Sequence, residues 1–138
     1  MTKTALLRFL RNHRWAIEAT VAKDGQPQAA VIGFAVSPKL ELVFDTSRRS
    51  RKAENLRRDR RVAMVIGWDE AQTVQIEGIA SELTGAERTR LLRVYVAQFP
   101  DGKARAKDPD IVLYAVRPTW ARYSDFRKMP AKIEEMKL

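Results

Sequence analysis

The chain has 138 residues, 45% hydrophobic and 31% charged, which suits one compact domain better than two. Lys and Arg number 26 against 17 Asp and Glu, and the net charge of +9 favours an anionic partner: nucleic acid, a phosphorylated cofactor or an anionic membrane. The absence of cysteine excludes disulfides, thiolate metal sites and cysteine nucleophiles. Because His13 is the single histidine, histidine-based metal centres and catalytic triads are excluded as well.

No segment of the sequence has the pattern of a membrane span or a signal peptide. The longest apolar run, residues 29–36, has eight residues and contains a glycine, against the ~20 that a spanning helix needs. Basic residues interrupt the leucines of residues 1–14, so no signal-peptide core is present. We therefore expect a soluble, cytoplasmic protein.

The first third of the chain predicts a short helix followed by a β-hairpin. Leucine and phenylalanine recur among basic residues in the segment 4–12, as in an amphipathic helix. Side chains then alternate with period two over residues 15–22, which is typical of a strand. One face of this strand carries Trp15, Ile17, Ala19 and Val21, and the other carries Ala16, Glu18, Thr20 and Ala22. The turn residues of segment 23–27 lead into a second β-rich run, 28–36.

The middle of the chain continues the meander and inserts a helix. A turn at 37–39 precedes a strand at 40–45, and Ser50 stands where the N-cap of a helix ending at residue 58 would lie. Segments 62–68 and 73–83 alternate as two further strands. Gly78 inside the second of them indicates a β-bulge or a close backbone approach.

The last third predicts one long helix, a loop, two strands and a tail. Apolar residues recur at helical spacing over residues 86–99, and Pro100 ends the helix. A polar loop covers 100–109, and strands at 111–116 and 120–123 flank Arg117-Pro118. We expect a domain over residues 1–125 and a loose, charged C-terminal tail over 126–138. The fold class is mainly β: a barrel of six or seven antiparallel strands with peripheral helices.

Charge is concentrated in residues 48–61, RRSRKAENLRRDRR, which contain eight basic and two acidic residues. Ser50, Arg51 and Lys52 lie where a strand gives way to a helix. Free N–H groups, the helix dipole, a hydroxyl and two cationic side chains at such a point suit a phosphate. The competing interpretation is a solvated, charged helix face, and composition alone does not decide between them.

Residues 44–68, FDTSRRSRKAENLRRDRRVAMVIGW, resemble the signature segment of the pyridoxamine 5′-phosphate oxidase-like, FMN-binding split-barrel superfamily. There, an aromatic strand end is followed by Thr, a short loop, Ser-Arg-Lys opening a helix, and a strand. The resemblance extends more loosely from the first helix to Tyr123. It implies an antiparallel split barrel, FMN as cofactor, and a homodimer with two equivalent cofactor sites across an isologous interface.

The resemblance also implies roles for individual residues. Arg51 and Lys52 fall on the positions that hold the FMN phosphate, and Thr46 falls on a strand-end position that contacts the flavin side. Val31 and Ile32 lie in the segment that follows the isoalloxazine, where they offer backbone contacts. Thr73 occupies a position where vitamin-processing members use Gln, and its shorter side chain reaches less far.

Two departures from the family pattern bear on function. The longer vitamin oxidases grip their substrate with a histidine-containing C-terminal segment, whereas no histidine follows His13, and Asp45 stands where an aromatic residue is usual. The expectation is therefore an FMN-binding flavoprotein and flavin-dependent oxidoreductase of unknown small-molecule substrate, with no catalytic acid or base assigned and no metal. The alternatives are a deazaflavin- or haem-binding member of the family and a non-catalytic, basic nucleic-acid-binding protein.

Overall fold

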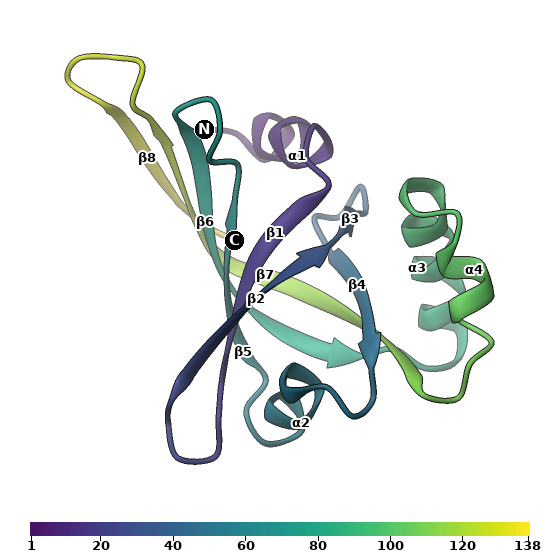
Figure 1. Ribbon diagram of the computed structural model, residues 1–138. Helices are drawn as coiled ribbons and strands as arrows, with labels where there is room; N and C mark the ends of the chain where they lie inside the picture. The colour runs from purple at the N-terminus through teal and green to yellow at the C-terminus, as the bar shows by residue number, and fades with distance from the viewer.

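The computed structural model describes residues 1–138, and its frame is a curled sheet of eight strands in which every pairing is antiparallel (Figure 1). The strands are β1 (Trp15–Val21), β2 (Pro27–Gly33), β3 (Ala35–Val36), β4 (Leu42–Ser47), β5 (Arg61–Ile66), β6 (Gln72–Glu82), β7 (Ile111–Asp125) and β8 (Lys132–Lys137). The helices are α1 (Lys3–Arg11), α2 (Arg51–Arg58), α3 (Gly85–Gln98) and α4 (Gly102–Arg105). The predicted fold class, an antiparallel split barrel with peripheral helices, is confirmed.

The split lies between two strands that are neighbours in sequence. The strand order is β2-β1-β5-β6-β7-β4-β3, with β8 added on β7, so β2 and β3 end at opposite edges of the sheet. The single strand predicted for residues 28–36 is wrong in this respect, because the chain leaves one edge at Gly33 and joins the other at Ala35. Phe34, between them, points into the barrel and is 1% exposed. Burial of this ring fixes the crossing point.

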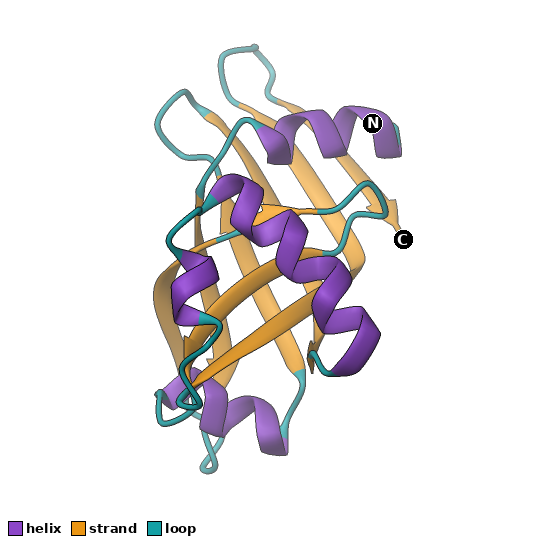
Figure 2. Cartoon of the chain, turned by 90° about the vertical axis from the view of Figure 1, so that its right-hand side faces the viewer, coloured by secondary structure: helices purple, strands orange, loops and turns teal.

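Two hydrophobic clusters lie on opposite sides of the sheet. The larger has 21 buried residues inside the curl, and Leu6 and Leu10 of α1 belong to it. The smaller lies under α3, where Leu91, Tyr95 and Phe99 pack against sheet residues that include Val43. Figure 2 shows α3 lying across the strands, so the long helix packs on the sheet as its apolar spacing predicts.

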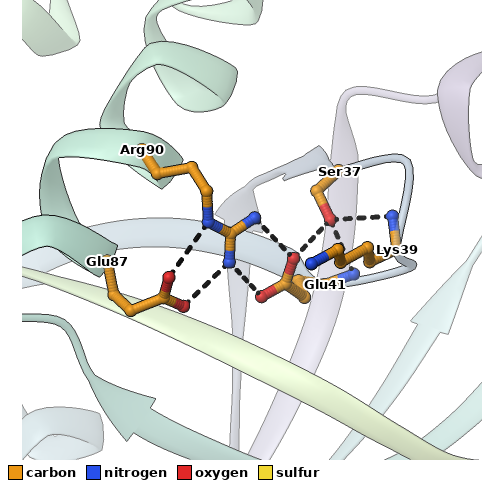
Figure 3. A network of polar contacts seen from close by, with 5 residues as sticks. All are labelled: Ser37, Lys39, Glu41, Glu87 and Arg90. Carbon is orange, nitrogen blue, oxygen red and sulfur yellow. Dashed lines mark hydrogen bonds and ion pairs between the residues drawn. The ribbon is translucent and has the colours of Figure 1, made fainter.

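An ion-pair network fixes α3 to the turn between β3 and β4 (Figure 3). The Arg90 guanidinium donates to both carboxylate oxygens of Glu41 at 3.0 and 2.8 Å and to those of Glu87 at 3.1 and 2.8 Å. Glu41 also accepts from the Ser37 hydroxyl at 2.8 Å. The Arg90 contact is the main cause of the lowered pKa of Glu41. Because Arg90 remains partly exposed, the network contributes orientation more than stability.

The two strands predicted at 111–116 and 120–123 are one strand, β7, and the predicted break at Arg117-Pro118 is wrong. The register with β6 shifts between Glu77 and Gly78: Gly78 is opposite Pro118, whereas Glu77 is opposite Trp120. A bulge accommodates proline in a strand because the residue without an N–H need not donate to the ladder. The bulge or close backbone approach predicted at Gly78 is thus confirmed: Gly78 lies beside the bulge, whose extra residue, Thr119, belongs to β7. The bulge explains why Pro118 does not end the strand.

Gly78→Ala is expected to destabilise the protein by about 1 to 3 kcal/mol, because an added Cβ overpacks this site. It would lie 2.7 Å from the Arg117 carbonyl oxygen and 2.8 Å from the Val116 Cγ1 atom, and the backbone contact cannot be relieved by a rotamer change. Urea denaturation of the wild type and variant measures the change. Ser81→Ala, on the same strand, serves as control and should change stability by less than about 0.5 kcal/mol. Equal values for the two variants would contradict the close approach.

The C-terminal segment, expected to be loose, instead forms β8 along β7. Ion pairs join Arg122 to Glu135 and the Met1 amino group to Glu134, the latter at 2.8 Å. Composition does not predict backbone pairing of this kind, because charged side chains are common on edge strands. The segment 100–109, predicted as a loop, contains the short helix α4. All four helices are too short or too polar to cross a lipid bilayer.

Candidate functional site

The start of α2 is built as its sequence predicts. Ser50 is the N-cap, and its Oγ accepts a hydrogen bond from the Ala53 N–H at 3.2 Å. The Thr46 hydroxyl, at the end of β4, donates to the same oxygen at 3.0 Å. The Arg51 and Lys52 N–H groups have no acceptor in the helix, since they belong to its first turn. The helix therefore presents free donors and the positive end of its dipole at this point.

A cavity of about 190 Å³ opens beside the first turn of α2. It is lined by Glu18, Thr20, Gln28, Ala29, Ala30, Arg51 and Lys52. Two cationic side chains of α2 thus face small and polar residues of the β1–β2 hairpin, and Figure 1 shows α2 beside that hairpin. The predicted phosphate-binding residues Arg51 and Lys52 are brought together in one hollow. This shape distinguishes them from a flat, solvated helix face.

The basic residues of segment 48–61 differ in their partners. Arg48, Arg49 and Arg61 pair with Glu82, Asp110 and Asp59, respectively. Arg57 donates to a backbone carbonyl, and Arg58 donates to the Asn55 side chain at 3.1 Å. Arg51 and Lys52 form no ion pair within the chain. Their charges are available to a ligand, in contrast to those of most of their neighbours.

Asn55 holds α2 against the hairpin. It is 3% exposed, and its Nδ2 donates to the Thr20 hydroxyl and to the Gln28 side-chain oxygen, each at 2.9 Å. A buried amide with satisfied donors fixes the relative position of the elements that it joins. Sequence reasoning missed Asn55, Thr20 and Gln28. The available signal is an asparagine on the apolar stripe of α2, between Ala53 and Leu56.

Glu18 is the least expected residue of the cavity wall. It is 1% exposed, and neither carboxylate oxygen has a hydrogen-bond partner. Burial raises its pKa to about 7, and the charge of Lys52 partly opposes this rise. A buried, unpartnered carboxyl is costly, so such a group in a cavity wall indicates that something else satisfies it. Its sequence signal is an acidic residue in the middle of a β-rich segment.

The predicted flavin contacts Val31 and Ile32 lie on β2, at one edge of the sheet. The Phe34 N–H donates to the Arg14 carbonyl and the Ala22 N–H to the Gln26 carbonyl. In an antiparallel ladder this alternation directs the backbone groups of Ile32 toward β1 and those of Val31 toward the open edge. Val31 therefore has a free backbone donor and acceptor, whereas those of Ile32 belong to the ladder.

Thr73 lies apart from the other predicted site residues. It is near the start of β6, opposite Ser124 of β7, and its hydroxyl donates to the Ile66 carbonyl at 3.4 Å. It does not line the cavity of Arg51 and Lys52. Within one copy of the chain, the structure does not bring Thr73 to the phosphate end of the site.

Asp45, the unusual residue at the end of the aromatic strand, belongs to a structural network. It accepts from the Arg105 Nε at 2.9 Å and from the Tyr95 hydroxyl at 3.0 Å. Burial is the largest cause of the raised pKa of Tyr95, about 12, and the nearby Asp45 carboxylate adds to it. These contacts tie α3 and α4 to β4. The departure from the family pattern at Asp45 therefore has a local structural explanation.

An apolar face lies on the outside of the sheet next to the cavity. Val31, Ile17 and Val65 form one cross-strand row over β2, β1 and β5, and Ala29, Ala19 and Ala63 form the next. Val31 is 64% exposed, and Trp15 at the end of this face is 52% exposed. The opposite side of β1 carries Ala16, Glu18 and Thr20 and points inward. On β1 the large apolar side chains thus point outward, while the small and polar ones point inward.

Comparison with known proteins places the chain in a family. Residues 2–125 match the family model described as pyridoxamine 5′-phosphate oxidase. The chain belongs to the pyridoxamine 5′-phosphate oxidase family. A pyridoxine/pyridoxamine 5′-phosphate oxidase of Cyanothece sp. is 33% identical over 73 residues, which are 52% of this chain and 34% of that enzyme. The match therefore spans about a third of the relative's length.

Two solved structures extend this family assignment to the fold. A haem binding protein from Mycobacterium smegmatis has a TM-score of 0.83 at 16% identity, covering 95% of this chain and 56% of that one. A pyridoxamine 5′-phosphate oxidase-related, FMN binding protein from Nostoc punctiforme has a TM-score of 0.71 at 14% identity, covering 99% and 95%. At such identities the likeness shows a shared fold.

The cavity suits the phosphate end of a flavin better than a haem. Two unpaired cations and the free N–H groups of α2 match a phosphate. A haem iron needs an axial imidazole, thiolate, thioether or phenolate, and no residue lining this cavity carries one. His13 lies elsewhere, at the end of α1, with its Nδ1 2.8 Å from the Phe9 carbonyl. The donor set of this cavity therefore suits a phosphate group.

Proposed function

We propose that the chain is an FMN-binding flavoprotein that acts as a flavin-dependent oxidoreductase. The observation that carries this proposal is the cavity at the start of α2, where Arg51 and Lys52 lack ion-pair partners while neighbouring arginines are engaged. Membership of the pyridoxamine 5′-phosphate oxidase family and the fold shared with an FMN binding protein support it. The domain we assign to the flavin covers residues 1–125, with 126–138 appended, and a cytoplasmic location remains a prediction from the sequence.

Each residue of the proposed site has a distinct task. Arg51 and Lys52 neutralise the phosphate, and the helix N-terminus that Ser50 caps donates N–H groups to it. Thr46 supports Ser50 and offers its strand end to the flavin side. Val31 offers the free backbone groups of the open edge to the ring. When bound, FMN would supply hydride transfer, so the chain needs to position the ring rather than provide an acid or a base.

We further propose that a second copy of the chain covers the apolar face of β2, β1 and β5. A two-fold, isologous interface suits this patch, since Val31, Ile17 and Val65 are apolar and lie in one row. Ala29 and Ala30 line the cavity and are exposed, so a copy placed on this face would shield the cofactor from water. In such a dimer, Thr73 of one copy would approach the cofactor bound by the other copy.

FMN titration tests the proposed function. The purified chain should quench free FMN fluorescence in a saturable manner and acquire an absorbance band at about 450 nm. Haem, a deazaflavin and duplex DNA serve as competing ligands in parallel titrations. If haem or the deazaflavin binds more tightly than FMN, that ligand replaces FMN as the proposed cofactor. DNA binding that falls steeply with salt, with no flavin binding, would favour the nucleic-acid alternative.

A further inference from the structure

Glu18 has no task in the site as proposed so far, although its carboxyl group is in the cavity wall. It lies on β1 opposite Ala30 of β2 and Met64 of β5, facing the interior of the barrel. Both oxygens are buried without a donor, whereas Thr20, two residues along the same face, is hydrogen-bonded to Asn55. A carboxylate that only filled space here would cost more than the apolar side chain that fits the same strand position.

The charged and titratable groups around Glu18 come from two elements. From α2, Lys52 faces it and favours its ionised form, and Arg51 lines the same cavity. From β7 comes the phenol of Tyr114, whose pKa is raised mainly by burial, with the charge of Glu18 among the smaller causes. The residues opposite it on β2 and β5, Ala30 and Met64, carry no charge. One ammonium group is therefore the main stabilising partner of an ionised Glu18.

We propose that Glu18 is a further residue of the cofactor site and that it takes up one proton from solvent when the phosphate group binds. The proposal rests on the proposed FMN function. A phosphate at Arg51 and Lys52 engages the ammonium group that favours the ionised carboxylate, and it adds negative charge to the same cavity. The proton forms an O–H bond on one Glu18 oxygen. The neutral carboxyl then offers the ligand one donor and one acceptor.

The sign of the pH dependence follows from this order of events. In the free chain the Glu18 pKa is about 7, so the group is mostly ionised at pH 8 and mostly neutral at pH 6. Bound phosphate raises this pKa, so Glu18 takes up a proton on binding at pH 8 and almost none at pH 6, where the phosphate, whose own pKa is about 6, can only release protons. Affinity for FMN should therefore fall as pH rises above 7, by at most about tenfold per unit. The phosphate itself, with a second pKa of about 6, is already a dianion at pH 8 and takes no part there.

Calorimetric titration of the full chain with FMN at pH 8, in two buffers of different ionisation enthalpy, measures the uptake directly. The wild type should take up about 0.5 to 0.9 proton per FMN at pH 8. Glu18→Gln, which is neutral and of equal size, should take up less than about 0.2 proton and bind FMN at pH 8 at least as tightly as the wild type. The matched control Glu54→Gln removes an exposed acid from the first turn of α2 and should keep the wild-type uptake.

The outcomes separate this inference from the proposed function. FMN binding with no proton uptake by the wild type, or with equal uptake by wild type and Glu18→Gln, overturns the role of Glu18 and leaves the flavin function intact. No FMN binding by the wild type overturns both. If Glu18→Gln does not fold, as judged by circular dichroism, the wild type decides alone: uptake at pH 8 that disappears at pH 6 supports the proposal, and equal values at both pH contradict it.

Discussion

Arg51→Ala is expected to weaken FMN binding by about 10- to 150-fold, because a charge-assisted hydrogen bond contributes roughly 1.5 to 3 kcal/mol. Arg51 lines the cavity and has no ion-pair partner in the chain, so its loss removes a ligand contact without breaking an internal one. Fluorescence titration with FMN measures the change. Circular dichroism and thermal unfolding should be unaltered, since the side chain is exposed.

The matched control for this experiment is Arg60→Ala. Arg60 is an exposed arginine of the same segment and lies beyond the end of α2, so its removal changes the net charge equally and should cost less than about fivefold in affinity. Arg58 is a poorer control, because it donates to Asn55 at 3.1 Å, and Asn55 anchors α2 to the cavity wall. Equal, small losses of FMN affinity for Arg51→Ala and Arg60→Ala would show that the phosphate binds elsewhere. The interpretation of α2 as a solvated, charged helix would then hold.

Ile17→Asp is expected to convert a dimer into a monomer. Light scattering should give twice the 15.8 kDa chain mass for the wild type at micromolar concentration and the chain mass for the variant. Ile17 lies between Val31 and Val65 in the centre of the apolar face, where an interface would bury an unpaired carboxylate at a cost of several kcal/mol. FMN affinity should fall by at least about tenfold as well, since the proposed second copy would shield the cofactor.

Ile133→Asp provides the comparison for the dimer experiment. Ile133 is also an exposed isoleucine, 52% accessible, but it lies on β8 and outside the apolar face. This variant should remain dimeric and bind FMN as the wild type does. A monomeric wild type with tightly bound FMN, or an Ile17→Asp variant that stays dimeric, would remove the shared site from the proposal.

Features set by neighbouring residues could be predicted from the sequence. Ser50 as N-cap, the helix that follows it and the bulge at Gly78 depend on local backbone chemistry, and the structure agrees with all three. Local sequence could not predict that β7 continues through Pro118. This continuity depends on the pairing with β6, where Glu77 and Gly78 lie opposite Trp120 and Pro118, so that Thr119 of β7 is the extra residue of the bulge.

The wall of the cavity also escaped prediction, for two physical reasons. Asn55 finds its partners, and Glu18 comes to line the cavity, only because α2 packs against the hairpin. This tertiary contact cannot be read from local sequence. The alternation of β1 indicates a strand but not its orientation: hydrophobic burial alone would turn Trp15 and Ile17 inward, whereas they point outward. An apolar outer face is consistent with burial against another surface rather than within one chain.

The open edge of β2 has a cost for the isolated chain. Its odd-numbered residues carry unpaired N–H and C=O groups, and the side chain of Val31 beside them is apolar and exposed. Such an edge is a template for adding strands from other molecules, which leads to aggregation. Pro27, at the first position of the strand, protects one end of the edge because it cannot donate to an incoming ladder. The central stretch around Val31 has no such protection, so the strand proposed to contact the cofactor is also where we expect the isolated chain to misassociate most readily.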